Sequence, residues 1–347
     1  MNLHFVSRGL PQLIMWLVST AIIVVMISIP MSTGGQAFLS IVAVTTIAVL
    51  KSNARRIVPR FFLLATASII ILRYFFWRLL VTLPDPGLTL SFLVGLTLIV
   101  VESYSIMVFF LNAFIGADPT RRQFPPTVAP TDLPTVDVLV PSFNEPREML
   151  SVTLAAAKNM IYPAEKRIVT LCDDGGTDQR CNAADPELAE AARARRADLQ
   201  ALCEELGIRY ATRALNEKAK AGNMSSALEN LTGDLVVVFD ADHVPSRDFL
   251  ARTVTNFVED PKLFLVQTPH FFINNDPIQR NLELSETCPP ENEMFYGLIH
   301  RGLDRWGGAF FCGSAAVLRR KALDEVGGFA GETITEDAET ALEIHSA

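Results

Sequence analysis

The sequence predicts two parts of different fold class, an α-helical transmembrane region followed by an α/β domain. Long apolar runs are confined to the first 117 residues. Beyond residue 134, apolar runs of strand length alternate with longer segments of helical pattern. Such alternation predicts a mainly parallel sheet covered by helices on both faces. We therefore expect four transmembrane helices in residues 1–124, a linker in residues 125–134 and a cytoplasmic domain in residues 135–347.

Four apolar runs reach or approach the about 17–25 helical residues that cross a bilayer core. They are Pro11–Met31, Gln36–Leu50, Phe61–Leu83 and Leu88–Ala117, of which the second is short and needs flanking residues. The first run lacks a clear small-residue cleavage site and is followed at once by further apolar segments, which favours a retained anchor over a signal peptide. Cations follow the second and fourth runs, and the positive-inside rule then predicts that both termini are cytoplasmic.

Two arginines lie within the third run, where a charge is costly unless it faces a protein interior or a wet pathway. For Arg73 we expect an interior role, with Glu102 of the fourth run as a possible partner. Arg78 lies near the end of its run, where its side chain can equally extend to the membrane surface.

The charge is divided along the chain. The net charge is −8, and residues 1–117 hold seven Lys/Arg against two Asp/Glu, so the remaining residues carry −13. An acidic domain argues against a nucleic-acid partner, which would require a basic surface. The five cysteines form no CxxC pair, which is typical of a reduced cytoplasmic domain without a structural zinc site.

A proline-rich connector at residues 125–134 marks the domain boundary, since successive prolines favour extended backbone. In the domain that follows, strands are predicted at Val136–Val140, Arg167–Leu171, Ile208–Thr212 and Leu235–Phe239, and helices at Arg147–Asn159, Pro186–Leu206, Ala219–Leu231 and Ala338–Ser346.

Polar segments follow three of the predicted strands: Ser142–Glu145, Asp173–Gly176 and Asp240–Asp242. Ligands of parallel sheets bind beyond the carboxyl ends of the strands. Asp240 and Asp242 are therefore candidate ligands of Mg²⁺ or Mn²⁺, which proteins hold with one or two carboxylates and substrate phosphates. A helix cap or solvated turn is the alternative, and His243 is either a further ligand or only hydrogen-bonded.

Three further segments, together with Asp173 and Asp174, complete a candidate site. Asp173 and Asp174 can hydrogen-bond a nucleoside, with glycines that let the backbone pass close, or form an ordinary turn. Lys220, at the head of a predicted helix, can receive phosphate. Asp337 is either a general base or a carboxylate at a helix start. The apolar segment Phe310–Ser314 is read as a core strand as readily as a surface for a sugar ring.

Together these motifs resemble the catalytic subunits of bacterial cellulose synthases, which are processive, inverting family 2 glycosyltransferases of GT-A fold. The resemblance rests on seven motifs in order, Asn144-Glu145-Pro146, Asp173-Asp174-Gly175, Lys220-Ala221-Gly222-Asn223, Asp240-Ala241-Asp242, Gln267-Thr268-Pro269-His270, Phe310-Phe311-Cys312-Gly313-Ser314 and Thr335-Glu336-Asp337. It implies UDP-glucose as donor, a β-1,4-glucan acceptor, Mg²⁺ or Mn²⁺, the bacterial inner membrane and a periplasmic partner subunit.

The resemblance also implies a role for each site residue. The uridine is contacted by Ser142, Glu145, Asp173 and Asp174, and the diphosphate by Lys220. The metal is bound by Asp240, Asp242 and His243. The acceptor is bordered by Phe310, Phe311 and Cys312, and Asp337 acts as the base. Residues 275–306 resemble interface helices that lie on the cytoplasmic membrane surface.

The sequence departs from the family at Ala347, ahead of its Gln-x-x-Arg-Trp motif and its carboxyl-terminal cyclic-di-GMP-binding domain. We therefore expect an amino-terminal part of the synthase, with inefficient polymer synthesis on its own. Two alternatives remain open. One is another processive family 2 synthase, of chitin or hyaluronan type, and the other is a non-catalytic, membrane-anchored nucleotide-sugar binder.

Overall fold

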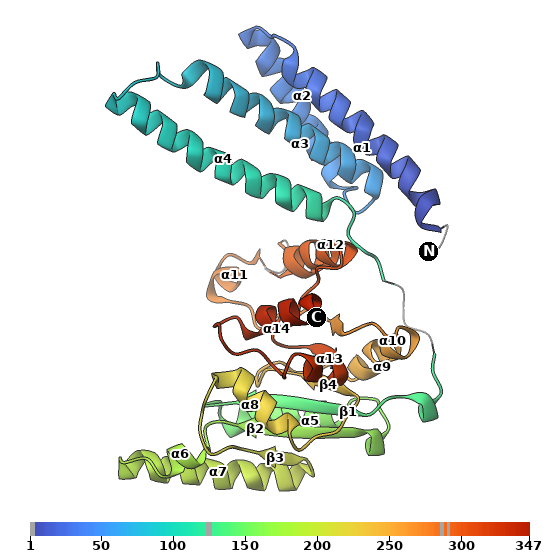
Figure 1. The fold of residues 1–347 in the computed structure, drawn as a ribbon, viewed down its shortest axis with the longest axis vertical. Coiled ribbons are helices and arrows are strands. Elements are labelled where there is room, and N and C mark those ends of the chain that lie inside the picture. Colours follow the sequence, from blue (N-terminus) through green and yellow to red (C-terminus); the bar gives the residue numbers. More distant parts are fainter. Residues whose placement is uncertain (1–3, 123–126, 285–287, 290–291) are drawn as a thin grey trace. The chain divides into compact units, whose positions relative to one another are not determined.

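The structure is a computed structural model that describes residues 4–122, 127–284, 288–289 and 292–347 (Figure 1). Its internal contacts divide the chain into two units. One unit comprises the residues up to Thr120 together with Arg301–Arg305, and the other comprises Arg121–His300 and Trp306–Ala347.

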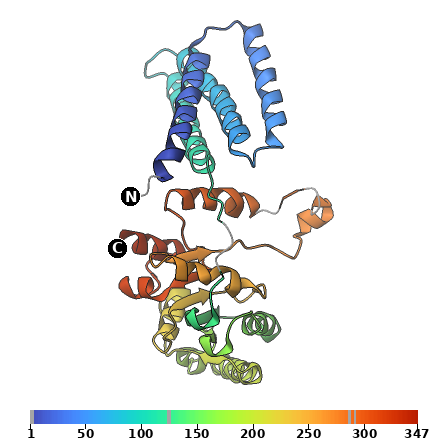
Figure 2. The same ribbon diagram turned by 90° about the vertical axis from the view of Figure 1, so that its right-hand side faces the viewer.

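The first unit is helical. Its helices are α1 (His4–Ser28), α2 (Thr33–Lys51), α3 (Ile57–Trp77), which continues into the π-helical turn η1 (Arg78–Thr82), and α4 (Leu90–Gly116). Helix α3 contacts each of the other three, and Figure 2 shows these helices from a second side. Within the described residues, α2, α3 with η1, and α4 are long and apolar enough to span a membrane, whereas the apolar part Trp16–Ser28 of α1 is shorter. The fourth span stays a prediction.

The two arginines of α3 have different partners. Arg78 Nε lies 3.0 Å from Glu102 Oε2, whereas the guanidinium of Arg73 donates to carbonyl oxygens at the end of α1, including that of Ile29 at 3.2 Å. The expected pairing of Arg73 with Glu102 is therefore wrong. The last carbonyls of a helix lack intrahelical partners and carry partial negative charge, so they accept a cation without a carboxylate.

The second unit contains a six-stranded sheet in the order β3-β2-β1-β4-β6-β5. The strands are β1 (Val136–Ser142), β2 (Arg167–Asp173), β3 (Arg209–Ala211), β4 (Leu235–Val238), β5 (Leu265–Gln267) and β6 (Ala316–Arg319). Strands β3, β2, β1 and β4 run parallel, and β6 is antiparallel to both β4 and β5. The predicted parallel part is confirmed, whereas β5 and the antiparallel β6 were not predicted.

Helices cover both faces of this sheet. The covering helices are α5 (Arg147–Lys158), α7 (Pro186–Leu206), α8 (Ala219–Leu228), α9 (Phe249–Thr253), α10 (Thr255–Glu259), α13 (Arg320–Glu325) and α14 (Glu336–Ser346). The chain also forms the short helices α6 (Asp178–Cys181), α11 (Pro277–Asn281) and α12 (His300–Arg305). One core layer contains residues of α5, α7, α9 and α10, among them Leu150 and Leu199. The other contains residues of α8, α13 and α14, among them Met224 and Leu323.

The register brings the ends of five strands to one edge of the sheet. Ser142 at the end of β1 pairs with Asp173 at the end of β2. Val238, the last residue of β4, and Gln267, the last of β5, both pair with Ala316, the first residue of β6. The polar segments that follow β1, β2, β4 and β5, whose ends span Ser142 to Gln267 in the sequence, therefore lie at a common edge with the segment that precedes β6.

The expected interface helices at residues 275–306 correspond in the structure to three short elements: α11, the π-helical turn η5 (Phe295–Ile299) and α12. Residues 285–287 and 290–291, which include Pro290, lie outside the described residues. Exposed apolar side chains precede α11 at Phe271, Phe272 and Ile273. Contact of this segment with a membrane surface stays a prediction.

Candidate active site

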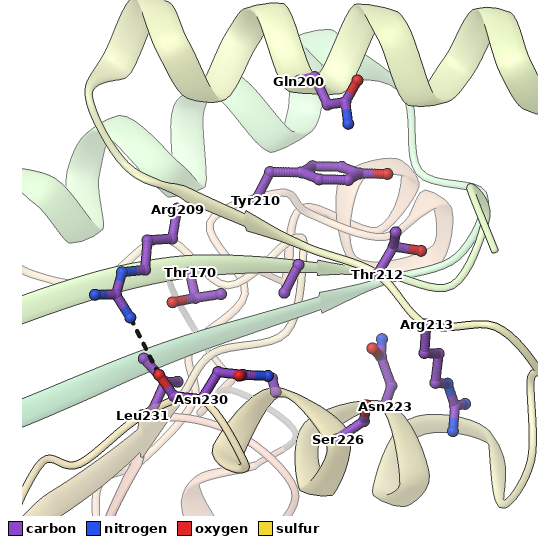
Figure 3. Close-up of a pocket in the computed structure, with 12 residues that line it drawn as sticks. Thr170, Gln200, Arg209, Tyr210, Thr212, Arg213, Asn223, Ser226, Asn230 and Leu231 are labelled. Carbon is purple, nitrogen blue, oxygen red and sulfur yellow. Dashed lines mark hydrogen bonds between the residues drawn. The ribbon is translucent and has the colours of Figure 1, made fainter. Parts of the chain in front are cut away.

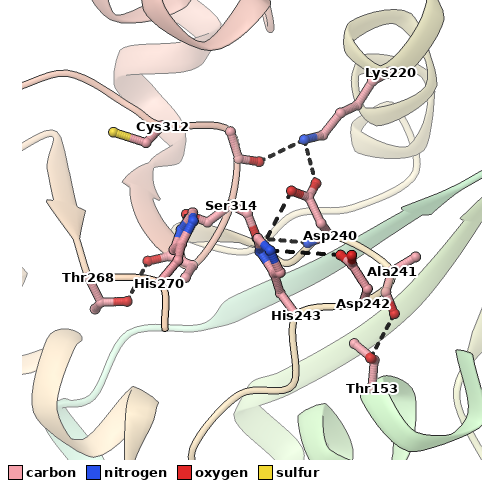
Figure 4. Close-up of polar contacts among 12 residues, drawn as sticks. Thr153, Lys220, Asp240, Ala241, Asp242, His243, Thr268, His270, Cys312 and Ser314 are labelled. Carbon is pink, nitrogen blue, oxygen red and sulfur yellow. Dashed lines mark hydrogen bonds and ion pairs between the residues drawn. The ribbon is translucent and has the colours of Figure 1, made fainter. Parts of the chain in front are cut away.

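The segment after β4 is held by a lysine from the head of α8. Lys220 Nζ donates to Asp240 Oδ1 at 2.5 Å and to the carbonyl oxygen of Gly313 at 2.9 Å (Figure 4). Glu336 Oε1 lies 3.7 Å from the same ammonium group. One cation thus joins α8, the turn after β4 and the segment before β6, and it stands beside two carboxylates.

Ser314 organises the same turn from the other side. Its buried hydroxyl oxygen accepts from the backbone N–H of Asp240 at 2.8 Å and lies 2.7 Å from His243 Nδ1. His243 Nε2 in turn lies 3.7 Å from Asp242 Oδ1. Sequence reasoning did not assign Ser314 a role, although its place in the apolar-to-small segment had drawn attention to it.

The residues after β4 fit a divalent cation in part. Within the described residues, no group of three or more His, Cys, Asp or Glu side chains converges as a metal cage. Asp242, whose side chain is 65% exposed, has carboxylate oxygens of the kind that Mg²⁺ and Mn²⁺ prefer. Protein ligands alone do not complete the shell here, which is usual for Mg²⁺ held together with substrate phosphates.

Gln267 and His270 fix the segment before β6. The side-chain oxygen of Gln267 accepts from the backbone N–H of Cys312 at 2.9 Å, and its amide nitrogen donates to the carbonyl oxygen of Ser314 at 2.8 Å. Burial lowers the pKa of His270, so a neutral ring is expected at pH 7. Its Nδ1 lies 3.0 Å from the hydroxyl of Tyr296, and its ring centroid 4.7 Å from that of His243.

The segment after β1 is closed by one carboxylate. A single oxygen of Glu145 accepts from the Ser142 hydroxyl and from the backbone N–H groups of Phe143 and Asn144, at 2.7 to 3.1 Å. Burial acts to raise the pKa of Glu145, but these donors outweigh it and lower the pKa overall. A charged Glu145 therefore shapes the end of β1.

The two aspartates after β2 are buried and paired with arginines. Asp174 accepts from Arg213 Nε and Nη2, both at 2.7 Å. Asp173 accepts from the Tyr210 hydroxyl at 2.9 Å and from Arg195 at 3.3 Å. Their predicted contact with a nucleoside stays a prediction, and it would require a ligand to replace some of these internal donors.

Sequence reasoning missed the arginines that hold these aspartates. Arg195 also donates to the Ser142 hydroxyl at 2.8 Å and to the Glu145 carbonyl at 2.7 Å, so it joins the ends of β1 and β2. It comes from α7, where it was one charge among many on an amphipathic helix. Nothing in its local sequence distinguishes it from the solvated charges beside it.

The glycines after Asp174 are required by close contacts within the protein, and their predicted approach to a nucleoside stays a prediction. A Cβ atom at Gly175 would lie 2.1 Å from the carbonyl oxygen of Phe143, and one at Gly176 would lie 2.6 Å from Asp173 Oδ2. Backbone cannot yield to such an atom, so this turn must lack side chains.

The expected acceptor residues divide between the core and the site. Phe311 is fully buried and packs 6.1 Å from the ring of Phe329, so its assignment to the acceptor surface is corrected to a core role. Phe310 and Cys312 are partly exposed, and residues 310–314 form no strand. Burial, followed by the nearby charge of Asp337, raises the pKa of Cys312 to about 12, so this thiol is neutral.

Of the two carboxylate oxygens of Asp337, one accepts a hydrogen bond and the other does not within the described residues. Its Oδ1 accepts from the backbone N–H of Ala338 at 2.8 Å in the first turn of α14, whose N-cap residue is Thr335. Within the described residues, Oδ2 has no hydrogen-bond partner and faces Gly313, beside the ammonium group of Lys220. The helix start thus orients the carboxylate and leaves an acceptor oxygen at the site.

The chain is similar to known glycosyltransferases over most of its length. The model of "Glycosyl transferase family 2" matches residues 137–327. The cellulose synthase catalytic subunit [UDP-forming] of Xanthomonas axonopodis pv. citri is 38% identical over 331 residues, which cover 95% of this chain and 42% of that protein. Cellulose synthase 1 of Komagataeibacter xylinus is 41% identical over 286 residues, or 82% of this chain and 17% of that protein. The chain thus spans less than half the length of either relative.

A solved structure with a similar chain path is a mannosyltransferase from Pyrobaculum calidifontis in complex with GDP-Man and Mn²⁺. It is 23% identical, with a TM-score of 0.45, and the match covers 70% of this chain and 59% of that one. The sequence relatives confirm the resemblance read from the seven motifs. The family match and the observed sheet confirm the predicted fold class, a helical region followed by an α/β glycosyltransferase domain of GT-A type.

Proposed function

Because the chain belongs to glycosyl transferase family 2, we propose that it transfers glucose from UDP-glucose to the end of a β-1,4-glucan, with inversion at the sugar. The observation that carries this proposal is the meeting of Lys220, Asp240 and the free oxygen of Asp337 at one edge of the sheet. The names of the sequence relatives, which are cellulose synthases, support the choice of sugar and product.

We infer three roles at that edge. Lys220 binds the diphosphate, since an ammonium group at a helix start is suited to phosphate oxygens. Its hydrogen bond to Asp240 is then either broken or kept beside the phosphate contact. Asp240, Asp242 and His243 would hold the Mg²⁺ or Mn²⁺ only together with the donor phosphates, and the metal would offset the charge of the leaving diphosphate. The carboxylate of Asp337 takes the proton of the attacking hydroxyl through Oδ2, while the N–H of Ala338 keeps Oδ1 in place.

The membrane setting is part of the proposal. Three described helices with the length and apolar composition of membrane spans precede the α/β unit. We propose a multi-pass protein of the bacterial inner membrane, with the α/β unit in the cytoplasm, a glucan acceptor and a periplasmic partner subunit.

Donor competition tests the sugar and the metal together. We expect UDP-glucose to bind detergent-solubilised protein more tightly than UDP-N-acetylglucosamine, and only with Mg²⁺ or Mn²⁺ present. Asp242→Asn should weaken the metal-dependent part, because it removes a charged oxygen ligand. Equal affinity for the two nucleotide sugars would argue against a cellulose product. Binding that does not depend on metal would refute the proposed metal site.

Turnover tests the base. We expect Asp337→Asn to slow metal-dependent transfer or hydrolysis of UDP-glucose by about 10²–10⁴-fold, the usual contribution of a general base, with donor affinity retained. Asn keeps the oxygen that accepts from Ala338, so the fold should be unaffected. Unchanged turnover in this variant would favour a non-catalytic nucleotide-sugar binder.

A further inference from the structure

A second cavity lies along the free edge of the sheet. Strand β3 is the last strand on its side, and a cavity of about 390 Å³ opens along it, lined mainly by residues of β3 and α8 and of the turns that follow them (Figure 3). The lining residues come from β2, β3, α7, α8 and the turns that follow β3 and α8. None of the residues proposed above to bind the donor, the metal or the acceptor lines it.

The cavity contains hydrogen-bonding groups without protein partners. Thr170 is 2% exposed, and its hydroxyl has no hydrogen-bond partner in the described part of the chain. A buried hydroxyl in that state is unfavourable and rare. The side chains of Gln200, Ser226 and Asn230 also line the cavity and, within the described ranges, make no hydrogen bond. Thr170, Ser226 and Asn230 lie on the α8 side of β3 and are available to one ligand, whereas Gln200 lies on the α7 side (Figure 3).

The charge of the cavity is positive at one end. In Figure 3, Arg209 lies with Thr170 and Asn230 at one end and Arg213 at the other. Arg213 is committed to Asp174, but Arg209 makes a single hydrogen bond, to the carbonyl oxygen of Asn230 at 3.3 Å. No Asp or Glu is among the described residues that line the cavity. Arg209 therefore keeps donors for an anion.

We propose that this cavity binds a small phosphorylated sugar. The phosphate lies against Arg209, whose forked donors match phosphate oxygens. The sugar hydroxyls bond to Thr170, Ser226 and Asn230. The volume is at the lower end of the range for small-molecule sites, which suits a ligand of this size. A peptide added to the sheet edge is disfavoured, because only three residues of β3 are in strand conformation.

Calorimetric titration of the detergent-solubilised chain with glucose 6-phosphate tests the proposal, with saturating UDP present to fill the donor site. We expect saturable binding that Arg209→Gln weakens about tenfold or more, since it removes charge-assisted hydrogen bonds. Arg252→Gln, which changes an exposed arginine on α9 outside the cavity, is the matched control and should leave binding unchanged.

Thr170→Val separates binding from folding. We expect it to weaken binding of glucose 6-phosphate while the thermal midpoint stays the same or rises, because the hydroxyl has no partner to lose in the free protein. Binding that is absent, or equal in Arg209→Gln and the unaltered chain, would overturn the site. Equal affinity for inorganic phosphate would overturn the role of the sugar, and tighter binding of uridine monophosphate would replace the sugar phosphate by a nucleotide.

Discussion

Two pairs of acidic residues follow parallel strands of the same sheet, yet their surroundings are opposite. Asp173 and Asp174, after β2, are almost fully buried and are held by Arg195, Tyr210 and Arg213. After β4, the side chain of Asp240 is 34% exposed and that of Asp242 is 65% exposed. The first pair is neutralised within the protein, whereas the second retains capacity for a ligand.

The difference shows that a carboxylate can lie at the ligand-binding edge of a sheet and still be unavailable to a ligand. Both pairs lie where a parallel sheet places ligands. Only the pair after β2 lies under a long helix that supplies an arginine, and a buried carboxylate without such a partner would be strongly unfavourable. We infer that the pair after β2 shapes the nucleoside side of the site, and the pair after β4 contacts the ligand.

The largest effect is expected from breaking the buried pair. Arg213→Ala leaves Asp174 buried without its cation, and we expect a loss of about 3–5 kcal/mol in the free energy of unfolding. Thermal unfolding followed by circular dichroism measures this loss. Arg147→Ala is the control, because its ion pairs with Asp198 and Glu205 are at the surface and should contribute about 1 kcal/mol or less. Similar losses in both variants would contradict the comparison.

At the more exposed pair, Asp240 and Asp242, a substitution should change ligand affinity more than stability. Lys220, which donates to Asp240, is the residue to change. We expect Lys220→Gln to lower the affinity for UDP about tenfold or more, because it removes a charged donor from the diphosphate. The measurement is UDP titration with Mg²⁺ at constant ionic strength. Lys218→Gln is the matched control, as Lys218 is exposed and pairs with Glu332 outside the site. An equal loss in both variants would show a general charge effect.

A smaller effect is expected from the support beneath Asp240. Ser314→Ala removes the oxygen that accepts from the Asp240 N–H and contacts His243. We expect a loss of about 1 kcal/mol in unfolding free energy and weaker metal dependence of UDP binding. A change in stability with unaltered metal dependence would limit Ser314 to a structural role.

The smallest effect should come from a buried carboxylate that has no paired arginine. Asp137 on β1 accepts from the Gly233 N–H, but its Oδ1 has no partner among the described residues. Burial raises the pKa of Asp137. A raised folded-state pKa means that its stabilising contribution is complete below the unfolded pKa of about 3.9 and is lost as the pH rises through the folded value.

Asp137→Asn should therefore gain stability relative to the unaltered chain as the pH increases from 5 to 8. Thermal midpoints of both proteins at the two pH values provide the test. Asp132→Asn, at an exposed position in the linker, is the control. A difference between the proteins that does not change with pH would mean that Asp137 is already charged at pH 5.

Much of the site was predictable because its residues occur in short local motifs. The turn after β2 needs glycines, Asp240 follows the end of a strand, and Lys220 lies in the first turn of a helix, and each of these is a property of a few neighbouring residues. Arg195 and Arg213 were not predictable, because their partners lie 22 and 39 residues away in the sequence. The local sequence left Phe311 undecided between the core and the acceptor surface, since an apolar segment beside a site is equally suited to packing and to a sugar.

The sequence by itself determined the apolar segments, the alternation of strands and helices, the family and the acidic clusters at strand ends, because these depend on hydrophobic periodicity and local turn chemistry. Only the tertiary structure decided which aspartates are neutralised, which oxygen of Asp337 is free and where a second cavity opens beside β3. Those properties depend on charges and packing surfaces brought together from distant segments, and no local pattern records them.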